Sequence, residues 1–228
     1  MTETIRGRLV LPDGEVLGDL SVDDDGRIAT IEPDGTAPAD VVVVPGFIDV
    51  HVHGYGGHDA MGGPEALSGM SRALARHGVT SFLPTSVTAA YADLTEYAES
   101  VRRWMPGAPA DGAEPLGFNM EGPFLSEAKK GAHPADLLRD PADIDEATLE
   151  TFVEGLRIIT IAPELPGALE MIKALAGRGV RVSLGHSAAS AAQARAGYAA
   201  GAVTTTHLFN AMIGAIHRDP GLALAALL

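Results

Sequence analysis

Several residues that can hold a divalent metal ion stand where the sequence predicts strands to end. They are His51, His53, Glu121, His186 and His207. Imidazole nitrogens and a carboxylate, without sulfur, suit Zn²⁺, Fe²⁺, Mn²⁺ or Co²⁺, and the sequence does not choose between these ions. Each residue alone has an ordinary structural explanation, such as a loop histidine or a capping carboxylate. Together they predict one metal site, because chance rarely places such residues at so many strand ends.

The stretch from Val41 to His53, VVVVPGFIDVHVH, is expected to position the first two of these residues. Its apolar run predicts a strand buried on both faces, as a parallel sheet requires. Side chains two positions apart in a strand point the same way, so His51 and His53 could bind one ion. We therefore expect this pair at the carboxyl end of the first strand of the main domain.

Strand-like and helix-like segments alternate from this stretch to the end of the chain. Further strands are expected at 79–85, 115–122, 156–164, 180–187 and 202–210, and helices at 64–77, 91–104, 146–154, 168–176, 189–200 and 222–228. Such alternation indicates a parallel sheet, either a doubly wound open sheet or a (β/α)₈ barrel. No G-x-G-x-x-G or Walker A sequence is present, and polar residues at several strand ends favour the α/β (β/α)₈ barrel, a TIM-like barrel.

Residues 1–44 predict a separate small β unit, part of a β-sandwich. Short β-type segments are divided there by the turn sequences Pro12-Asp13-Gly14 and Asp25-Gly26. We assign residues 45–228 to a partial (β/α)₈ barrel that forms the catalytic domain. About six strands fit before Leu228, whereas a complete barrel has eight strands in roughly 250 residues. We therefore expect a chain truncated after about six strands, whose open sheet edges keep it from folding natively alone.

Composition excludes several classes of function. The chain has 228 residues, of which 46% are apolar and 20% charged, as in ordinary globular proteins. A formal charge of −14 argues against binding to nucleic acid or to an anionic membrane surface. The absence of cysteine excludes disulfides and thiolate ligands. The N-terminus lacks a signal-peptide pattern and no long apolar run follows, so we expect a cytoplasmic protein with no membrane contact.

Five short motifs carry a resemblance to a known family. In chain order they are DVHVHG, EGPFL, KKGAH, LGHS and THLFNAM. They resemble the N-acetylglucosamine-6-phosphate deacetylase family of the amidohydrolase superfamily. The resemblance implies that Glu121, His186 and His207 hold the principal ion. It also implies that His51 and His53 can hold a second one, giving one or two divalent ions per subunit. Zinc is our first candidate, with iron, manganese or cobalt as alternatives.

The same resemblance implies a sugar-phosphate substrate and assigns residues to it. Ala132 and His133 would contact the substrate, and His133 is suited to polarising the amide carbonyl. Asn210 and Ala211 would contact the sugar. Arg218 would bind the 6-phosphate, since a guanidinium offers phosphate paired N–H donors. The implied reaction is hydrolysis of the N-acetyl amide of N-acetylglucosamine 6-phosphate, and the implied assembly is a homodimer.

Some assignments remain open in the sequence. The family's general base is an aspartate at the end of the eighth strand, which we expect beyond Leu228, so activity of the 228 residues alone is doubtful. The expected fourth strand has no lysine to bridge two ions, so a carboxylate must do so. Glu121 is the candidate, whereas Glu164 is expected to have a structural hydrogen-bonding role. The alternatives are another amidohydrolase, acting on a cyclic amide or a deaminase substrate, or a non-catalytic fragment that binds metal or sugar phosphate.

Overall fold

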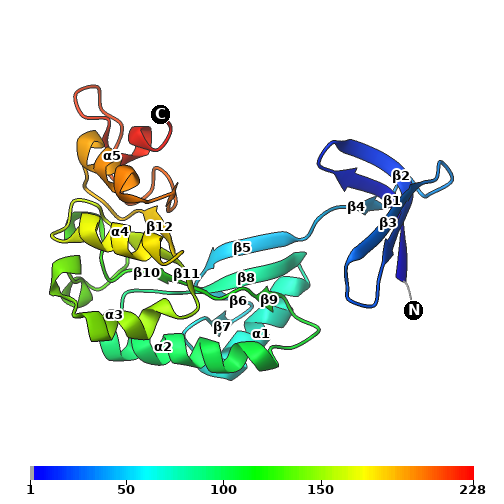
Figure 1. Ribbon diagram of the computed structural model, residues 1–228, viewed down its shortest axis with the longest axis horizontal. Coiled ribbons are helices and arrows are strands. Elements are labelled where there is room, and N and C mark those ends of the chain that lie inside the picture. The colour runs from blue at the N-terminus through cyan, green and yellow to red at the C-terminus, as the bar shows by residue number, and fades with distance from the viewer. Residues whose placement is uncertain (1–2) are drawn as a thin grey trace. The chain divides into compact units, whose positions relative to one another are not determined.

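The computed structural model describes residues 3–228, and the chain divides after Phe47 into two compact units (Figure 1). The first unit contains one four-stranded sheet in the order β3-β2-β1-β4. Strands β1 and β2 form an antiparallel hairpin in which Leu11 pairs with Gly14, so its turn lies at the predicted Pro12-Asp13. The strands are β1 (Glu3–Leu11), β2 (Gly14–Val22), β3 (Ile28–Pro33) and β4 (Val42–Val43).

The second unit is a parallel half-barrel, as the alternation of strands and helices predicts. Its sheet runs in the order β13-β12-β11-β10-β8-β5, so neighbouring strands follow one another along the chain, and β9 pairs with β8. Because all carboxyl ends of parallel strands lie at one edge, the side chains that follow them are brought together. The strands are β5 (Phe47–Val52), β8 (Val79–Ser86), β9 (Glu114–Pro115), β10 (Phe118–Glu121), β11 (Leu156–Ile161), β12 (Arg181–Leu184) and β13 (Thr204–Thr205).

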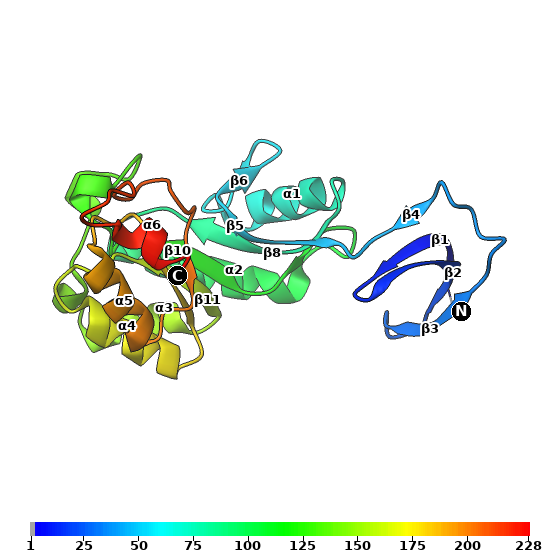
Figure 2. The same cartoon turned by 90° about the horizontal axis from the view of Figure 1, so that it is seen from above.

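Helices pack beside one another in chain order and cover the half-barrel. α1 contacts α2, α2 contacts α3, α4 contacts α5, and the C-terminal α6 lies beside α5 (Figure 1). A short hairpin, β6 (Gly54–Tyr55) and β7 (His58–Asp59), contacts α1 (Figure 2). The helices are α1 (Gly63–Ala75), α2 (Tyr91–Trp104), α3 (Glu146–Val153), α4 (Ala168–Gly177), α5 (Ala191–Ala200) and α6 (Gly221–Ala225).

The core lies between these helices and the sheet. Leu67 of α1, Phe82 of β8 and Ile159 of β11 are all fully buried in one hydrophobic cluster. Burying such side chains contributes about 1.5–3 kcal/mol each, which fixes the strands and thus the positions of their ends. None of the helices formed by residues 3–228 has the length and apolar character needed to span a bilayer.

The prediction of one strand buried on both faces from Val41 to His53 is wrong. Strand β4 pairs with β1 in the first unit, and β5 begins only at Phe47 in the other sheet. Pro45 lies between them and has no N–H to donate to a sheet, so the apolar run is divided between two sheets.

Candidate metal centre

Glu121, the last residue of β10, lies at the centre of a cluster of histidines. Its side chain is only 4% exposed, and its two carboxylate oxygens face different partners. Oε1 lies 3.2 Å from Nε2 of His186 and 3.0 Å from Nε2 of His207. These two nitrogens are themselves 2.9 Å apart, so three atoms from β10 and from the segments after β12 and β13 form a tight triangle.

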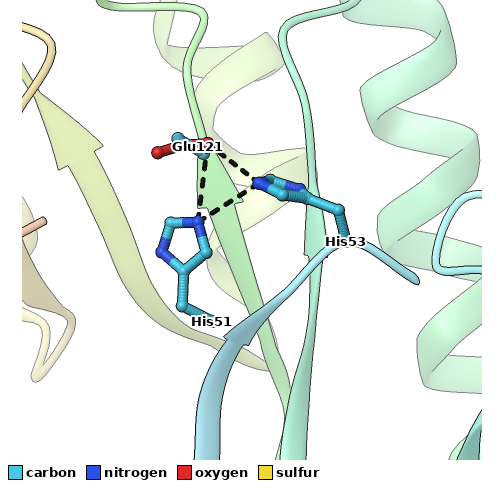
Figure 3. A group of neighbouring side chains, drawn as sticks. All are labelled: His51, His53 and Glu121. Atoms are coloured by element: carbon cyan, nitrogen blue, oxygen red, sulfur yellow. Dashed lines mark hydrogen bonds and ion pairs between the residues drawn. The ribbon is translucent and has the colours of Figure 1, made fainter. Parts of the chain in front are cut away.

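The second oxygen of Glu121 faces the histidine pair of β5 (Figure 3). Oε2 lies 2.9 Å from Nε2 of His53 and 3.5 Å from Nε2 of His51. The two histidine nitrogens are 3.2 Å apart, and the three residues lie close enough to share one ion. The structure thus brings all five predicted ligands together, with one carboxylate between two pairs of histidines.

Three of these histidines are held by the same kind of hydrogen bond on the side away from Glu121. A carbonyl oxygen only accepts, so each Nδ1 must carry the hydrogen, and Nε2 of the neutral ring keeps a lone pair. Those lone pairs point at the carboxylate. A histidine that ligates a metal usually has this arrangement, because the outer hydrogen bond fixes its tautomer. The pairs are His53 with Thr85 (3.1 Å), His186 with Lys129 (2.9 Å) and His207 with Asn210 (3.1 Å).

The arrangement suits a bound cation. Lone pairs of nitrogen and oxygen that face one another at 2.9–3.2 Å repel unless a proton or a metal ion lies between them. Two nitrogens bound to one tetrahedral zinc ion, at about 2.0–2.1 Å each, are separated by about 3.3 Å. The nitrogen and oxygen atoms around Glu121 therefore fit a divalent metal ion both in type and in spacing.

His133 differs from these ligands in its tautomer. Its side chain is buried, and its Nε2 lies 3.4 Å from Oε2 of Glu121. The backbone N–H of Thr88 donates to Nδ1 of His133 at 3.2 Å, so that nitrogen holds a lone pair. The hydrogen of the neutral ring is then on Nε2 and faces the site. By distance alone Glu121, His133 and His186 could share an ion, but His133 presents a donor where a ligand needs a lone pair.

The cluster shifts the pKa values of its members. Burial raises the pKa of Glu121, but hydrogen bonds from His133, His186 and His207 outweigh it and hold this pKa well below its ordinary value. The hydrogen bond to Glu121 raises the pKa of His53, and a similar bond raises that of His207. The carboxylate is therefore ionised at neutral pH, and the raised pKa values of His53 and His207 favour protons on these two rings beside it.

The backbone around two of the histidines adopts an unusual conformation. Among residues 3–228, the non-glycine residues with positive φ are His186 (46°), His207 (32°), Phe209 (73°) and Ala211 (50°). All four follow β12 or β13. The left-handed region costs roughly 1–3 kcal/mol per residue, and such residues cluster at functional sites where the surrounding structure enforces them. This conformation directs both imidazoles at Oε1 of Glu121.

The residues predicted to contact substrate lie in the segment between β10 and β11 and in the segment after β13. Ala132 is exposed beside His133, and the N–H of Asn210 donates to the carbonyl of His207 at 2.8 Å. The carbonyl of Ala211 accepts from the N–H of Ser187 at 3.1 Å. Arg218 is exposed, and its Nε lies 3.4 Å from Nε2 of His217. Within residues 3–228, no hydrogen bond or ion pair joins Arg218 to Glu121 or to the five histidines around it.

Glu164, the reserve carboxylate, has the hydrogen-bonding role expected of it. It accepts from the hydroxyl of Ser187 at 2.7 Å and from the N–H of Ala188 at 2.5 Å. Both donors belong to the segment that follows His186. Glu164 therefore supports the loop that carries His186 and leaves Glu121 as the carboxylate of the cluster.

The end of β8 contributes residues that the sequence reading did not identify. The hydroxyl of Thr85 accepts from the N–H of Val52 at 3.0 Å, next to His53, and Thr88 contacts His133. Asn119 donates from Nδ2 to the carbonyl of Val50 at 2.9 Å and so links β10 to β5 across β8. The polar sequence TSVT, at the end of β8, could have indicated Thr85 and Thr88 as site residues, because functional residues are expected at strand ends.

Comparisons with known proteins identify the family of the chain. A sequence model described as the amidohydrolase family matches residues 42–227. The chain is 39% identical to an N-acetylgalactosamine-6-phosphate deacetylase of Escherichia coli O157:H7, over 100% of this chain and 62% of that relative. It is 41% identical to an N-acetylglucosamine-6-phosphate deacetylase of Vibrio furnissii, over 92% of this chain and 54% of that relative.

A solved structure has a similar fold. The crystal structure of the N-acetylglucosamine-6-phosphate deacetylase from Thermotoga maritima matches with a TM-score of 0.90 and 31% sequence identity. The match covers 99% of this chain and 60% of that chain. The chain therefore spans between 54% and 62% of the length of these three proteins.

Proposed function

Since the chain belongs to the amidohydrolase family, we propose that the whole protein removes the acetyl group from N-acetylglucosamine 6-phosphate. Water is consumed, the C–N bond of the amide breaks, and glucosamine 6-phosphate and acetate are released. The observation that carries this proposal is the carboxylate of Glu121, which has ligand-type histidines at both oxygens. Relatives named as deacetylases of this sugar phosphate support the choice of substrate.

The histidines on the two sides of Glu121 would hold the metal. His186 and His207 would hold the principal ion, and His51 and His53 a second one, with zinc as the first candidate. A divalent ion in such a site lowers the pKa of a bound water and polarises a carbonyl group. Glu121 would contribute to both positions, because each of its oxygens faces one histidine pair.

His133 would act on the acetyl carbonyl of the substrate. Its Nε2–H points into the site beside Glu121, where a donor can stabilise the negative charge that develops on the carbonyl oxygen. Removing one such donor typically lowers the rate about 10²- to 10³-fold. His133 is therefore the catalytic residue that we assign within the described chain.

The remaining assignments concern substrate recognition, the general base and assembly. Ala132, Asn210 and Ala211 would contact the sugar, and Arg218 the 6-phosphate. A carboxylate must also accept a proton from water and return one to the leaving amine. Asp219 is already occupied, because it accepts from the N–H groups of Ala191 and Gly221 at 3.0 and 3.2 Å. We keep the family's strand-eight aspartate as the base, a homodimer as the assembly, and a cytoplasmic location as predictions.

The galactosamine epimer is a second candidate substrate. The relative from Escherichia coli O157:H7, which matches the whole chain, is named for N-acetylgalactosamine 6-phosphate. The two sugars differ only in the configuration at C4, whereas the amide and the phosphate are the same. The cluster around Glu121 acts on the amide and therefore cannot distinguish them.

Release of acetate by the full-length protein tests the proposal. The substrates are N-acetylglucosamine 6-phosphate, its galactosamine epimer, and N-acetylglucosamine without phosphate. We expect release from a phosphorylated sugar, with kcat/KM at least about 100-fold lower for the unphosphorylated one, since charged hydrogen bonds to phosphate are lost. Equal rates with and without phosphate would remove Arg218 from its role. No release from any of the three would favour another amidohydrolase substrate or a non-catalytic binding protein.

A further inference from the structure

Thr88, in the loop between β8 and α2, contacts the imidazole of His133 in two ways. Its backbone N–H donates to Nδ1 of His133 at 3.2 Å, and its hydroxyl oxygen lies 2.8 Å from the same nitrogen. Thr88 is 2% exposed and His133 is 6% exposed, so water does not replace these bonds easily. Nδ1 of His133 therefore takes its hydrogen bonds from one residue.

The direction of these bonds fixes the tautomer of His133. An amide N–H can only donate, so Nδ1 must be unprotonated, and the hydroxyl of Thr88 then has to donate as well. The three ligand histidines with assigned tautomers have a carbonyl in the corresponding position, which forces the opposite arrangement. The same fold thus sets one histidine as a hydrogen-bond donor and its neighbours as lone-pair ligands.

The surrounding chain holds Thr88 and His133 in place. A Cβ at Gly122 would lie 2.1 Å from the hydroxyl oxygen of Thr88, so a glycine directly after Glu121 leaves room for that side chain. Gly122 also has φ of +95°, which disfavours other residues. On the opposite side, the N–H of His133 donates to the carbonyl of Lys130 at 3.1 Å. The contact therefore joins three segments of the proposed site: the loop after β8, the glycine after Glu121, and the loop that carries Lys130 and His133.

We propose that Thr88 is a positioning residue, which holds His133 with its hydrogen on Nε2 so that it donates to the amide oxygen of the substrate. This inference rests on the proposed function for its chemical consequence, but the tautomer itself can be measured without any substrate. In the other tautomer, a lone pair on Nε2 would face the oxygen that becomes negative in the reaction, and the stabilising hydrogen bond would be lost.

Nuclear magnetic resonance of the full-length protein with ¹⁵N-labelled histidine tests the tautomer directly. The protein is loaded with zinc, and the signal that disappears in His133→Asn identifies His133. We expect the nitrogen shifts and couplings of His133 to show a protonated Nε2 and an unprotonated Nδ1. A protonated Nδ1 in the neutral ring would overturn the inference whether or not the protein deacetylates sugar phosphates.

A double-mutant cycle tests whether Thr88 acts through His133. Thr88→Val removes the hydroxyl and keeps the backbone N–H, and we expect kcat to fall roughly ten-fold with KM little changed, as for one lost hydrogen bond. Thr88→Ser keeps the hydroxyl and should restore most of kcat. In a protein that already carries His133→Asn, Thr88→Val should have no further effect, because residues that act as one unit are not additive.

A matched control separates positioning from general stability. Thr95→Val removes a partly buried hydroxyl elsewhere in the second unit, in α2, where it contacts the hydroxyl of Thr151 at 3.0 Å. This change should leave kcat and the shifts of His133 unaltered. If Thr88→Val lowered kcat by the same factor with and without His133, Thr88 would have a merely structural role and the inference would be wrong. Absence of activity in the unaltered protein would contradict the proposed function. The nuclear magnetic resonance result would then decide the inference about the tautomer of His133.

Discussion

The two sides of the Glu121 carboxylate face histidines that the fold holds in different ways. On the Oε1 side, His186 and His207 follow β12 and β13 and adopt left-handed backbone conformations, with φ of 46° and 32°. On the Oε2 side, His51 and His53 belong to β5 and the residue after it, and neither has a positive φ. The side chains of His186 and His207 are 6% and 29% exposed, compared with 27% for His51 and 39% for His53, so the backbone separates the two sides more clearly than exposure does.

This difference indicates which side binds metal more tightly. A strained backbone persists only where the surrounding contacts enforce it, so the positions of His186 and His207 are fixed before any ion arrives. Pre-organised ligands lose less conformational freedom on binding, whereas the backbone at His51 and His53 is not held in the left-handed region. We therefore expect the tighter ion on the Oε1 side and the weaker one on the Oε2 side.

Removal of the carboxylate should have the largest effect, because both sides share it. Glu121→Gln in the full-length protein keeps the shape but removes the negative charge that both sides share, and it replaces one of the two ligand oxygens with an NH2 group, which cannot ligate a metal ion. We expect zinc affinity to fall by more than about 100-fold at both positions, measured by competition with a chelator. Glu96→Gln is the control, since Glu96 is an exposed carboxylate of α2 that pairs with Arg103 at 2.9 Å, and its loss should leave the metal content unchanged. Full zinc content in the Glu121 variant would refute a shared carboxylate.

Changes on the Oε1 side should remove the principal ion. In either His186→Ala or His207→Ala we expect loss of stoichiometric zinc and of activity, because each ring provides one of three closely spaced donors. Elemental analysis after dialysis measures the number of zinc ions bound per chain. One ion per chain retained in both variants would show that the principal ion is bound elsewhere.

Changes on the Oε2 side should be milder. His51→Ala should weaken only a second ion, so that one zinc per chain remains after dialysis and a second equivalent binds at least about 10-fold more weakly than in the unaltered protein. His77→Ala, which alters an exposed histidine, is the control. If His51→Ala emptied the protein of zinc, the ranking of the two sides would be reversed.

The pH dependence of the metal-free protein should be the smallest of these effects. The raised pKa values of His53 and His207 mean that their stabilisation is complete below about pH 6.5 and is lost as pH rises through the folded pKa. The lowered pKa of Glu121 means that its stabilisation persists above about pH 4.5 and is lost only at lower pH.

Urea unfolding of the full-length protein in buffer that contains a chelator measures how the stability of the metal-free protein depends on pH. We expect a lower midpoint at pH 8.5 than at pH 6, and this difference should shrink with saturating zinc, because the ion then replaces the protons. A metal-free protein that is more stable at pH 8.5 than at pH 6 would show that protons on these histidines do not compensate Glu121.

Local patterns in the sequence predicted much of the second unit. The helix expected at 91–104 is α2 (Tyr91–Trp104), because its apolar spacing and the flanking turns agree. Strand ends were also predictable in kind, since apolar runs followed directly by His or Glu locate the carboxyl edge of a parallel sheet. This is why Glu121 and the four histidines His51, His53, His186 and His207 could be grouped from the sequence.

Other features depend on long-range packing and could not be predicted. The division of the valine run between two sheets depends on which strands β4 and β5 meet, and residue spacing alone does not specify those partners. The left-handed conformation of His186 is enforced by contacts from distant loops, such as the N–H of Ser126, which donates to its carbonyl at 2.9 Å. The contact of Thr88 with His133 spans 45 positions along the chain, and neither residue type alone indicates a partner.

A zinc anomalous difference map from crystals of the full-length protein tests the central claim most directly. We predict the strongest peak at about 2.0–2.2 Å from Glu121, His186 and His207, with any second, weaker peak on the side of His51 and His53. His133 should lie beside the ions without ligating either. A strongest peak that Glu121 does not contact, or one that Nε2 of His133 ligates, would contradict the account.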